Sequence, residues 1–296
     1  MNRNISNDGT AVKTALLLAA GMGSRLSPLT DSSPKCLVKV SRISILERLM
    51  RALRSHGFTK LFVVTGHLSE TIEDYLGSHY LGIEIAYIAS PLYNTTNNIY
   101  SLWLAGKDID EPFLLVESDL VFQPELLTPM LQPDRIAISK MLPWMNGTTV
   151  TLNNLKILQG FCLGAESRNN SSHYKTVNIY NFSRNTWRLI QKRLDQYISA
   201  GKVNGYYEEV FAEMFAEGTI SFAPVFFDAS RWYEIDTLED LGAAEKMFPE
   251  TYKVKFAAEE KLLPLYKAIG KRSKEVLSYP IPSVSALPSV LPTPIG

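Results

Sequence analysis

Short apolar runs alternate with amphipathic stretches through the first 120 residues of the chain. Residues 11–20 form a continuous apolar run that ends at Gly21, a pattern typical of a buried parallel strand. Residues 43–57 instead place their leucines on one helical face and stop at Gly57, which predicts a helix. By the same criteria, strands are predicted at residues 11–20, 60–66, 83–90 and 111–119, and helices at residues 43–57, 69–80 and 98–109.

This alternation of strand and helix predicts repeated βαβ units and therefore a parallel sheet covered on both faces. Open parallel sheets bind ligands beyond the carboxyl ends of their strands. Gly21, Gly66 and Asp119 each follow a predicted strand. We therefore expect these three residues to lie around one cleft.

The second half of the chain is less regular. Residues 149–164 and 173–183 alternate between apolar and polar, which predicts a small antiparallel addition to the sheet. The fold class predicted is α/β, a Rossmann-like three-layer sandwich with a mostly parallel mixed sheet. Further strands are predicted at residues 135–142, 219–227 and 231–236, and helices at residues 185–201, 205–218 and 237–248.

The carboxyl-terminal residues differ in composition from the rest. We expect one domain over residues 1–249 and a C-terminal helix over residues 250–275. Residues 276–296 are rich in proline, which is typical of an extended tail or linker. A further domain beyond this tail, and a homodimer, are both compatible with the sequence.

Composition narrows the classes of partner. The 30 Lys and Arg residues balance the 30 Asp and Glu residues, so no global field favours nucleic acid or an anionic membrane. No apolar run approaches the ~18 residues that a membrane span needs. The two cysteines, Cys36 and Cys162, are far apart and in no metal-binding spacing, which favours a reducing compartment. We expect a cytoplasmic protein that binds neither nucleic acid nor membrane.

The loop that follows the first strand carries the clearest chemical signal. Gly21 and Gly23 let a ligand approach the backbone closely, and Arg25 and Lys35 supply two cations over the strand end. The third glycine of a dinucleotide fingerprint and the Gly-Lys-Ser/Thr of a Walker loop are both absent. A plain surface loop with a stray Arg and Lys is the alternative, but the length and position of this loop favour a clamp for a triphosphate.

The same loop, LLLAAGMGSRLSPLTDSSPKCLV, resembles the opening of the sugar-phosphate pyrophosphorylase-like nucleotidyltransferase superfamily. Its form AAGxGxRLxPLTxxxPKxLxxV is almost unbroken, with Cys36 in place of the commoner Ala or Pro. The resemblance covers about residues 14–248. Five later blocks are more similar to the CTP-using branch that contains the 2-aminoethylphosphonate and phosphocholine cytidylyltransferases: residues 93–104, 116–122, 174–183, 205–211 and 232–241.

The resemblance implies transfer of CMP from CTP to a small phosphonate or phosphate, with pyrophosphate as the leaving group. It implies Mg²⁺ as cofactor, held by Asp119 and Asp236, since Mg²⁺ prefers one or two carboxylates together with water and phosphates. Each aspartate has an alternative role as the N-cap of the helix predicted after it. Their positions beyond strand ends favour the metal.

The remaining residues of the nucleotide site also follow from the resemblance. Arg25 and Lys35 are the expected catalytic cations, because they can neutralise the phosphates in the transition state. The pyrimidine is expected against the loop backbone and to be read by Asn98 and Ser101, although Asn97 and Asn98 could equally be helix N-caps. The loop residues expected at the nucleotide are Ala19, Ala20, Gly21, Met22, Gly23 and Ser24.

The acceptor site is the least determined by the sequence. An aromatic cage would bind a trimethylammonium group by cation–π attraction, and Glu208 with Glu209 would suit an amine that donates hydrogen bonds. Lys140 and Lys175 could meet the phosphonate or phosphate. The alternatives are core aromatics and an ordinary helix surface. An aminoalkylphosphonate is favoured, with phosphocholine next; the candidate cage residues are Trp144, Tyr174, Tyr180, Tyr206, Tyr207 and Trp232.

Two other functions share parts of this pattern. A hexose-1-phosphate nucleotidylyltransferase would share the loop and both aspartates, but a Gly-Glu-Lys sugar-binding block is absent here. A non-catalytic nucleotide-sensing subunit would be expected to have lost a loop cation or a metal aspartate. The presence of all four residues favours an enzyme.

Overall fold

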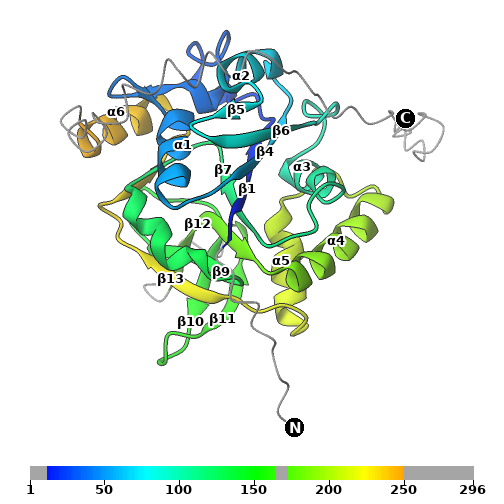
Figure 1. The fold of residues 1–296 in the computed structure, drawn as a ribbon. Helices are drawn as coiled ribbons and strands as arrows, with labels where there is room; N and C mark the ends of the chain where they lie inside the picture. Colours follow the sequence, from blue (N-terminus) through cyan, green and yellow to red (C-terminus); the bar gives the residue numbers. More distant parts are fainter. Residues whose placement is uncertain (1–11, 165–172, 250–296) are drawn as a thin grey trace, which may run out of the picture.

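The computed structural model describes residues 12–164 and 173–249 of the chain. At its centre, four strands run parallel in the order β7-β1-β4-β6, and β5 closes the edge antiparallel to β6 (Figure 1). Their carboxyl ends therefore meet at one edge, as predicted. The bounds are β1 Thr14–Ala19, β4 Lys60–Thr65, β5 His79–Tyr80, β6 Ile83–Ala89 and β7 Phe113–Glu117.

An antiparallel region extends the sheet beyond β7. Strand β12 pairs antiparallel with β7, β9 and β10, while β11 pairs with β10, and β13 lies parallel to β9. The predicted antiparallel addition is present. The bounds are β9 Arg135–Lys140, β10 Thr149–Leu152, β11 Leu158–Cys162, β12 His173–Phe182 and β13 Ala223–Phe227.

Two hydrophobic cores lie on opposite faces of the sheet, because successive side chains of a strand point to opposite faces. Leu17 of β1 packs in the core that contains Leu49 of α1, whereas Leu16 packs in the core that contains Leu102 of α3. Figure 1 shows α1 on one side of the sheet and α3, α4 and α5 on the other. The α/β three-layer class is confirmed. The bounds are α1 Ile45–Ser55, α2 Ser69–Leu76, α3 Asn98–Ala105, α4 Arg184–Ser199, α5 Tyr207–Ala216 and α6 Leu238–Met247.

Several short elements were not predicted. The most consequential is β8, because it pairs antiparallel with β14 outside the main sheet. Strands β2 and β3 form a separate two-stranded sheet. The bounds are β2 Lys39–Val40, β3 Ile43–Ser44, β8 Leu120–Phe122, β14 Trp232–Glu234, and three 3₁₀ helices, η1 Ser24–Leu26, η2 Lys35–Leu37 and η3 Pro124–Leu131.

The predicted helix over residues 250–275 and the tail over residues 276–296 lie outside the described residues. Within residues 12–164 and 173–249, no helix combines the length and apolar character that a membrane span requires.

Candidate active site

The pairing of β8 with β14 brings together two aspartates that are far apart in the sequence. Asp119 lies between β7 and β8, and Asp236 follows β14 directly. The backbone N–H of Ile235 donates a hydrogen bond to the Asp119 carbonyl at 3.0 Å. The two aspartates therefore lie side by side at the carboxyl edge of the parallel strands.

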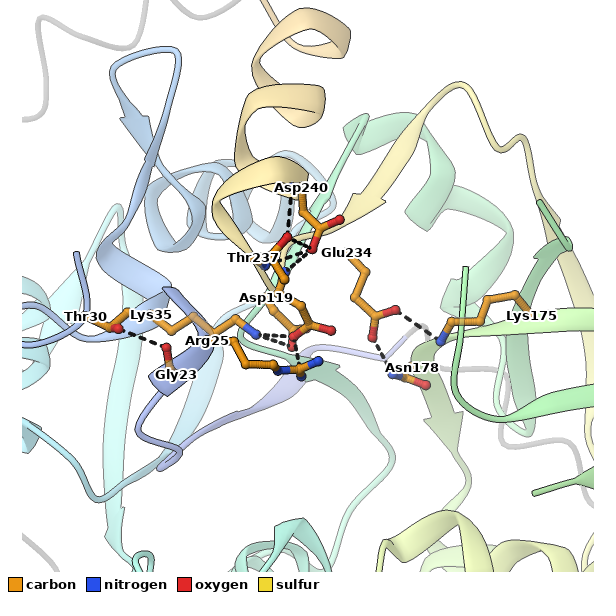
Figure 2. Close-up of polar contacts among 11 residues, drawn as sticks. Gly23, Arg25, Thr30, Lys35, Asp119, Lys175, Asn178, Glu234, Thr237 and Asp240 are labelled. Atoms are coloured by element: carbon orange, nitrogen blue, oxygen red, sulfur yellow. Dashed lines mark hydrogen bonds and ion pairs between the residues drawn. The ribbon is translucent and has the colours of Figure 1, made fainter. Parts of the chain in front are cut away.

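Lys35 bridges these two carboxylates, and Figure 2 shows its side chain directed at Asp119. Its Nζ lies 3.0 Å from Oδ2 of Asp119 and 2.8 Å from Oδ1 of Asp236. Arg25 also reaches Oδ1 of Asp236, with Nη2 at 2.8 Å, but its side chain is largely exposed. Burial by itself lowers the pKa of Lys35, yet the two carboxylates more than offset this effect and raise the pKa above its ordinary value. Lys35 is therefore charged and held by two carboxylates, whereas Arg25 is exposed and held by Asp236.

The alternative role of the two aspartates as helix caps is excluded by the helix ends. Helix α6 has Thr237 as its N-cap, with Asp240 completing a capping box, and η3 has Gln123 as its N-cap. Neither Asp119 nor Asp236 caps the helix that follows it, so their carboxylates remain available for another partner.

The two aspartates fit a magnesium ion by the chemistry of their oxygens. Oδ1 of Asp119 is buried and has no hydrogen-bond partner among the described residues. A buried carboxylate oxygen without a partner is costly unless a ligand satisfies it. No group of three metal-binding side chains occurs in the described parts of the chain, and Mg²⁺ commonly uses one or two carboxylates with substrate phosphates and water.

The loop from Gly21 to Lys35 is held in place by contacts among its own residues. Gly23 has φ 63°, in the left-handed region, and a Cβ there would lie 3.1 Å from Cβ of Lys35. Thr30 Oγ1 donates to the Gly23 carbonyl at 2.9 Å and so fastens the loop. At Gly21, by contrast, a Cβ would meet no atom within 4 Å. The backbone at Gly21 therefore faces open space that a ligand can enter.

A cavity of about 1040 Å³ contains most of the predicted nucleotide and metal residues. Ala19 does not line it, because this residue is buried in the core, and Met22 does not line it either, because its side chain is exposed outside. The predicted residues that line the cavity are Ala20, Gly21, Gly23, Ser24, Arg25, Lys35, Asn98, Ser101, Asp119, Glu208, Glu209 and Asp236.

The two asparagines at the start of α3 have different roles. Asn97 is the N-cap, and its Oδ1 accepts from the N–H of Asn98 at 2.8 Å. Asn98 accepts from the N–H of Tyr207 at 3.1 Å and donates to Glu117 at 3.4 Å. The capping alternative is therefore correct for Asn97, whereas Asn98 connects α3 to the start of α5 at the cavity wall.

The predicted aromatic cage is not assembled at the cavity. Tyr180 and Tyr207 are fully buried in an aromatic cluster with Phe211, so these residues are core. Trp144 stacks on Tyr233 with ring centroids 4.4 Å apart and does not line the cavity. Of the six candidate cage residues, Tyr206 lines the cavity and the other five, including Tyr174 and Trp232, do not.

The predicted acceptor lysines also lie apart from the cavity wall. Lys140 is exposed at the end of β9. Lys175 is 2% exposed, and its Nζ lies 3.2 Å from Oε2 of Glu234 and 2.9 Å from the Thr176 carbonyl (Figure 2). Lys175 is therefore tied to a residue of the cavity wall rather than facing the cavity itself.

The sequence analysis missed several polar residues of the cavity wall, among them Glu117, Asn178 and Glu234. Burial raises the pKa of both glutamates, although Lys175 opposes this shift at Glu234. Each glutamate stands two positions before an aspartate that was predicted to bind the metal, as ESD and EID. Since alternate residues of a strand share a face, this spacing was a usable signal.

The comparisons with known proteins agree with this geometry. Residues 14–136 match the family described as nucleotidyl transferase. The predicted resemblance to nucleotidyltransferases is thereby confirmed. The chain is 28% identical over 257 residues to the CMP-5'-(3-aminopropyl)phosphonate synthase of Streptomyces rubellomurinus, covering 83% of this chain and 40% of that protein. It is 27% identical over 233 residues to the 2-aminoethylphosphonate cytidylyltransferase of Lancefieldella rimae, covering 77% of this chain and 90% of that protein.

A solved structure shows the same fold. The CTP:phosphocholine cytidylyltransferase of Streptococcus pneumoniae superposes with a TM-score of 0.68 at 21% identity, covering 81% of this chain and 100% of the other. This likeness extends over both the parallel and the antiparallel regions. The chain spans less than half the length of the Streptomyces relative.

Proposed function

We propose that this protein is a magnesium-dependent cytidylyltransferase. It transfers CMP from CTP to a small phosphonate or phosphate that carries a cationic amine, and releases pyrophosphate. One observation carries the proposal: Asp119, Asp236 and Lys35 form a single charged cluster in the cavity beyond the parallel strands. The names of the cytidylyltransferase relatives support cytidine as the nucleotide.

The chain's own residues would position two polyanions and neutralise their charge. The backbone at Gly21 offers close approach to the nucleotide, and Arg25 and Lys35 hold its phosphates. Asp119 and Asp236 would hold Mg²⁺, which supplies additional positive charge against the phosphate oxygens. No general base is needed, because the attacking phosphonate or phosphate oxygen is already ionised at neutral pH.

For the acceptor, 2-aminoethylphosphonate is favoured and phosphocholine comes next. The cavity wall carries the carboxylates of Glu117, Glu208 and Glu234, whereas its aromatic residues are Tyr93 and Tyr206. Carboxylates suit an amine that donates hydrogen bonds, while a trimethylammonium group relies on aromatic faces.

The test is pyrophosphate release with Mg²⁺. CTP, UTP, ATP and GTP are each combined with 2-aminoethylphosphonate, phosphocholine, phosphoethanolamine and glucose 1-phosphate, with Asp119→Asn as the inactive control. We expect turnover with CTP and an aminoalkylphosphonate or a cationic phosphate, lost in the variant. Release with glucose 1-phosphate alone, or in no combination, would contradict the proposal.

A further inference from the structure

Glu208 is a buried carboxylate in the wall of the cavity, and one of its oxygens has no hydrogen-bond partner among the described residues. It lies in the first turn of α5, is 5% exposed and lines the cavity. The oxygen without a partner is Oε2. A buried anionic oxygen without a donor destabilises the free protein, so this arrangement is expected where a ligand supplies the donor.

The charges around Glu208 leave an excess of negative charge. Glu117 lines the same cavity as Glu208, and Nδ2 of Asn98 donates to Oε1 of Glu117 at 3.4 Å. Lys175, the nearby buried cation, is already paired with Glu234 at 3.2 Å. Among the described residues Glu117 and Glu208 thus form no ion pair of their own, although the charge of Lys175 also acts on Glu208.

The neighbouring Glu209, although predicted for the same task, is occupied elsewhere. Its Oε1 accepts from the N–H of Tyr206 at 3.2 Å, so it caps the start of α5. Its carboxylate also packs so closely on Gly205 that a Cβ there would lie 2.9 Å from Oε2. Of this pair, Glu208 is the residue with a buried oxygen that lacks a hydrogen-bond partner among the described residues.

We propose that Glu208, together with Glu117, forms the subsite that binds the ammonium group of the acceptor and selects a primary amine over a quaternary one. A primary ammonium brings three N–H donors to the unsatisfied oxygen, whereas a trimethylammonium brings none. This inference rests on the proposed function and specifies which acceptor class it takes. An ordinary helix-terminus role for Glu208 would give no such discrimination.

The experiment compares three acceptors of similar size with CTP and Mg²⁺. They are 2-aminoethylphosphonate, its N-trimethyl analogue and propylphosphonate, whose tail is neutral. In the wild-type protein we expect kcat/KM to be highest for the primary amine by roughly 10- to 100-fold, the range expected for a hydrogen bond to a charged group. Glu208→Gln should remove this preference by raising KM for the amine while leaving propylphosphonate unchanged. Glu84→Gln, an exposed carboxylate outside the cavity, is the matched control.

Two outcomes would overturn the inference. Equal loss with all three acceptors in Glu208→Gln would show that the residue only supports α5. Equal use of the trimethyl analogue and the amine by the wild type would show that the subsite does not read N–H donors. If no acceptor gives pyrophosphate, the proposed function fails. Calorimetric binding of 2-aminoethylphosphonate against propylphosphonate, in wild type and Glu208→Gln, then tests the subsite by itself, and equal binding of the two would overturn it.

Discussion

The parallel and antiparallel regions of this sheet contribute to the cavity in different ways. The parallel strands deliver Gly21 and Asp119 at their carboxyl ends, which is where the sequence predicted them. Of the residues expected at the acceptor, Tyr180 lies in the predicted antiparallel addition and Lys140 and Trp144 lie just before it, and none of these lines the cavity.

The difference shows what topology alone can determine. In a parallel sheet every strand ends at the same edge, so a residue after a strand is placed by its position in the sequence. In an antiparallel strand, the register and the face that each side chain occupies determine whether a residue reaches the cavity. Strand β12 has an irregularity against β9 between Thr176 and Tyr180, and within it Asn178 adopts φ 58° and lines the cavity. No periodic pattern in the sequence indicates that turn of the backbone.

The largest effect on activity is expected for Lys35→Met. Loss of the ammonium that bridges Asp119 and Asp236 should lower kcat by on the order of 10²-fold or more. Because Lys35 contacts one oxygen of each carboxylate proposed to hold the metal and adds a positive charge beside it, Mg²⁺ should also raise the unfolding temperature of the variant more than that of the wild type. Pyrophosphate release and thermal unfolding measure the two effects, with exposed Lys39→Met as control. An equal response to Mg²⁺ in variant and wild type would argue against a shared site.

Two glycines of the parallel region should separate packing from binding. In Gly66→Ala the new Cβ would lie 2.7 Å from Cβ of Tyr93 and 2.8 Å from the Ala20 carbonyl, so unfolding should become easier by about 1–3 kcal/mol. In Gly21→Ala the Cβ meets nothing, so stability should hardly change while KM for CTP rises several-fold. Denaturant unfolding and nucleotide kinetics on both variants measure this. A Gly21→Ala enzyme with unchanged KM would exclude close approach of the nucleotide there.

The buried carboxyl of Glu208 makes the stability of the folded protein depend on pH. Burial raises the pKa of its carboxyl from 4.5 to about 7. The folded state therefore binds a proton more tightly than the unfolded state, and this contribution to stability is complete below pH 4.5 and lost as the pH rises through about 7. Glu208→Gln should remove up to about 3 kcal/mol of that decline. Denaturant unfolding at several pH values, compared with Glu84→Gln, checks it, and an unchanged pH profile would contradict the burial effect.

The smallest effect is expected for a residue that was predicted at the acceptor but does not line the cavity. Trp144→Phe keeps a ring that can stack on Tyr233 and touches no cavity residue, so KM for the acceptor should change less than about threefold. Acceptor kinetics measure this. A large rise in KM would show that Trp144 contributes to acceptor binding.

By itself, the sequence determined the order of the main strands and helices, the α/β class, and the loop from Gly21 to Lys35 with its two cations. The strands and helices follow from the periodicity of apolar residues, and the loop follows from its glycines. Both signals involve only a few neighbouring residues. It also placed Asp119 and Asp236 as separate candidates after predicted strands.

Only the tertiary structure decided that these residues form one site. The pairing of β8 with β14 brings Asp236 to Asp119, and Lys35 between them fixes both carboxylates. It also placed Tyr180 and Tyr207 in the core and left a buried oxygen of Glu208 without a hydrogen-bond partner among the described residues. The physical reason is that contacts between distant segments depend on register and on which face a side chain occupies, and neither is encoded in the local pattern of one strand.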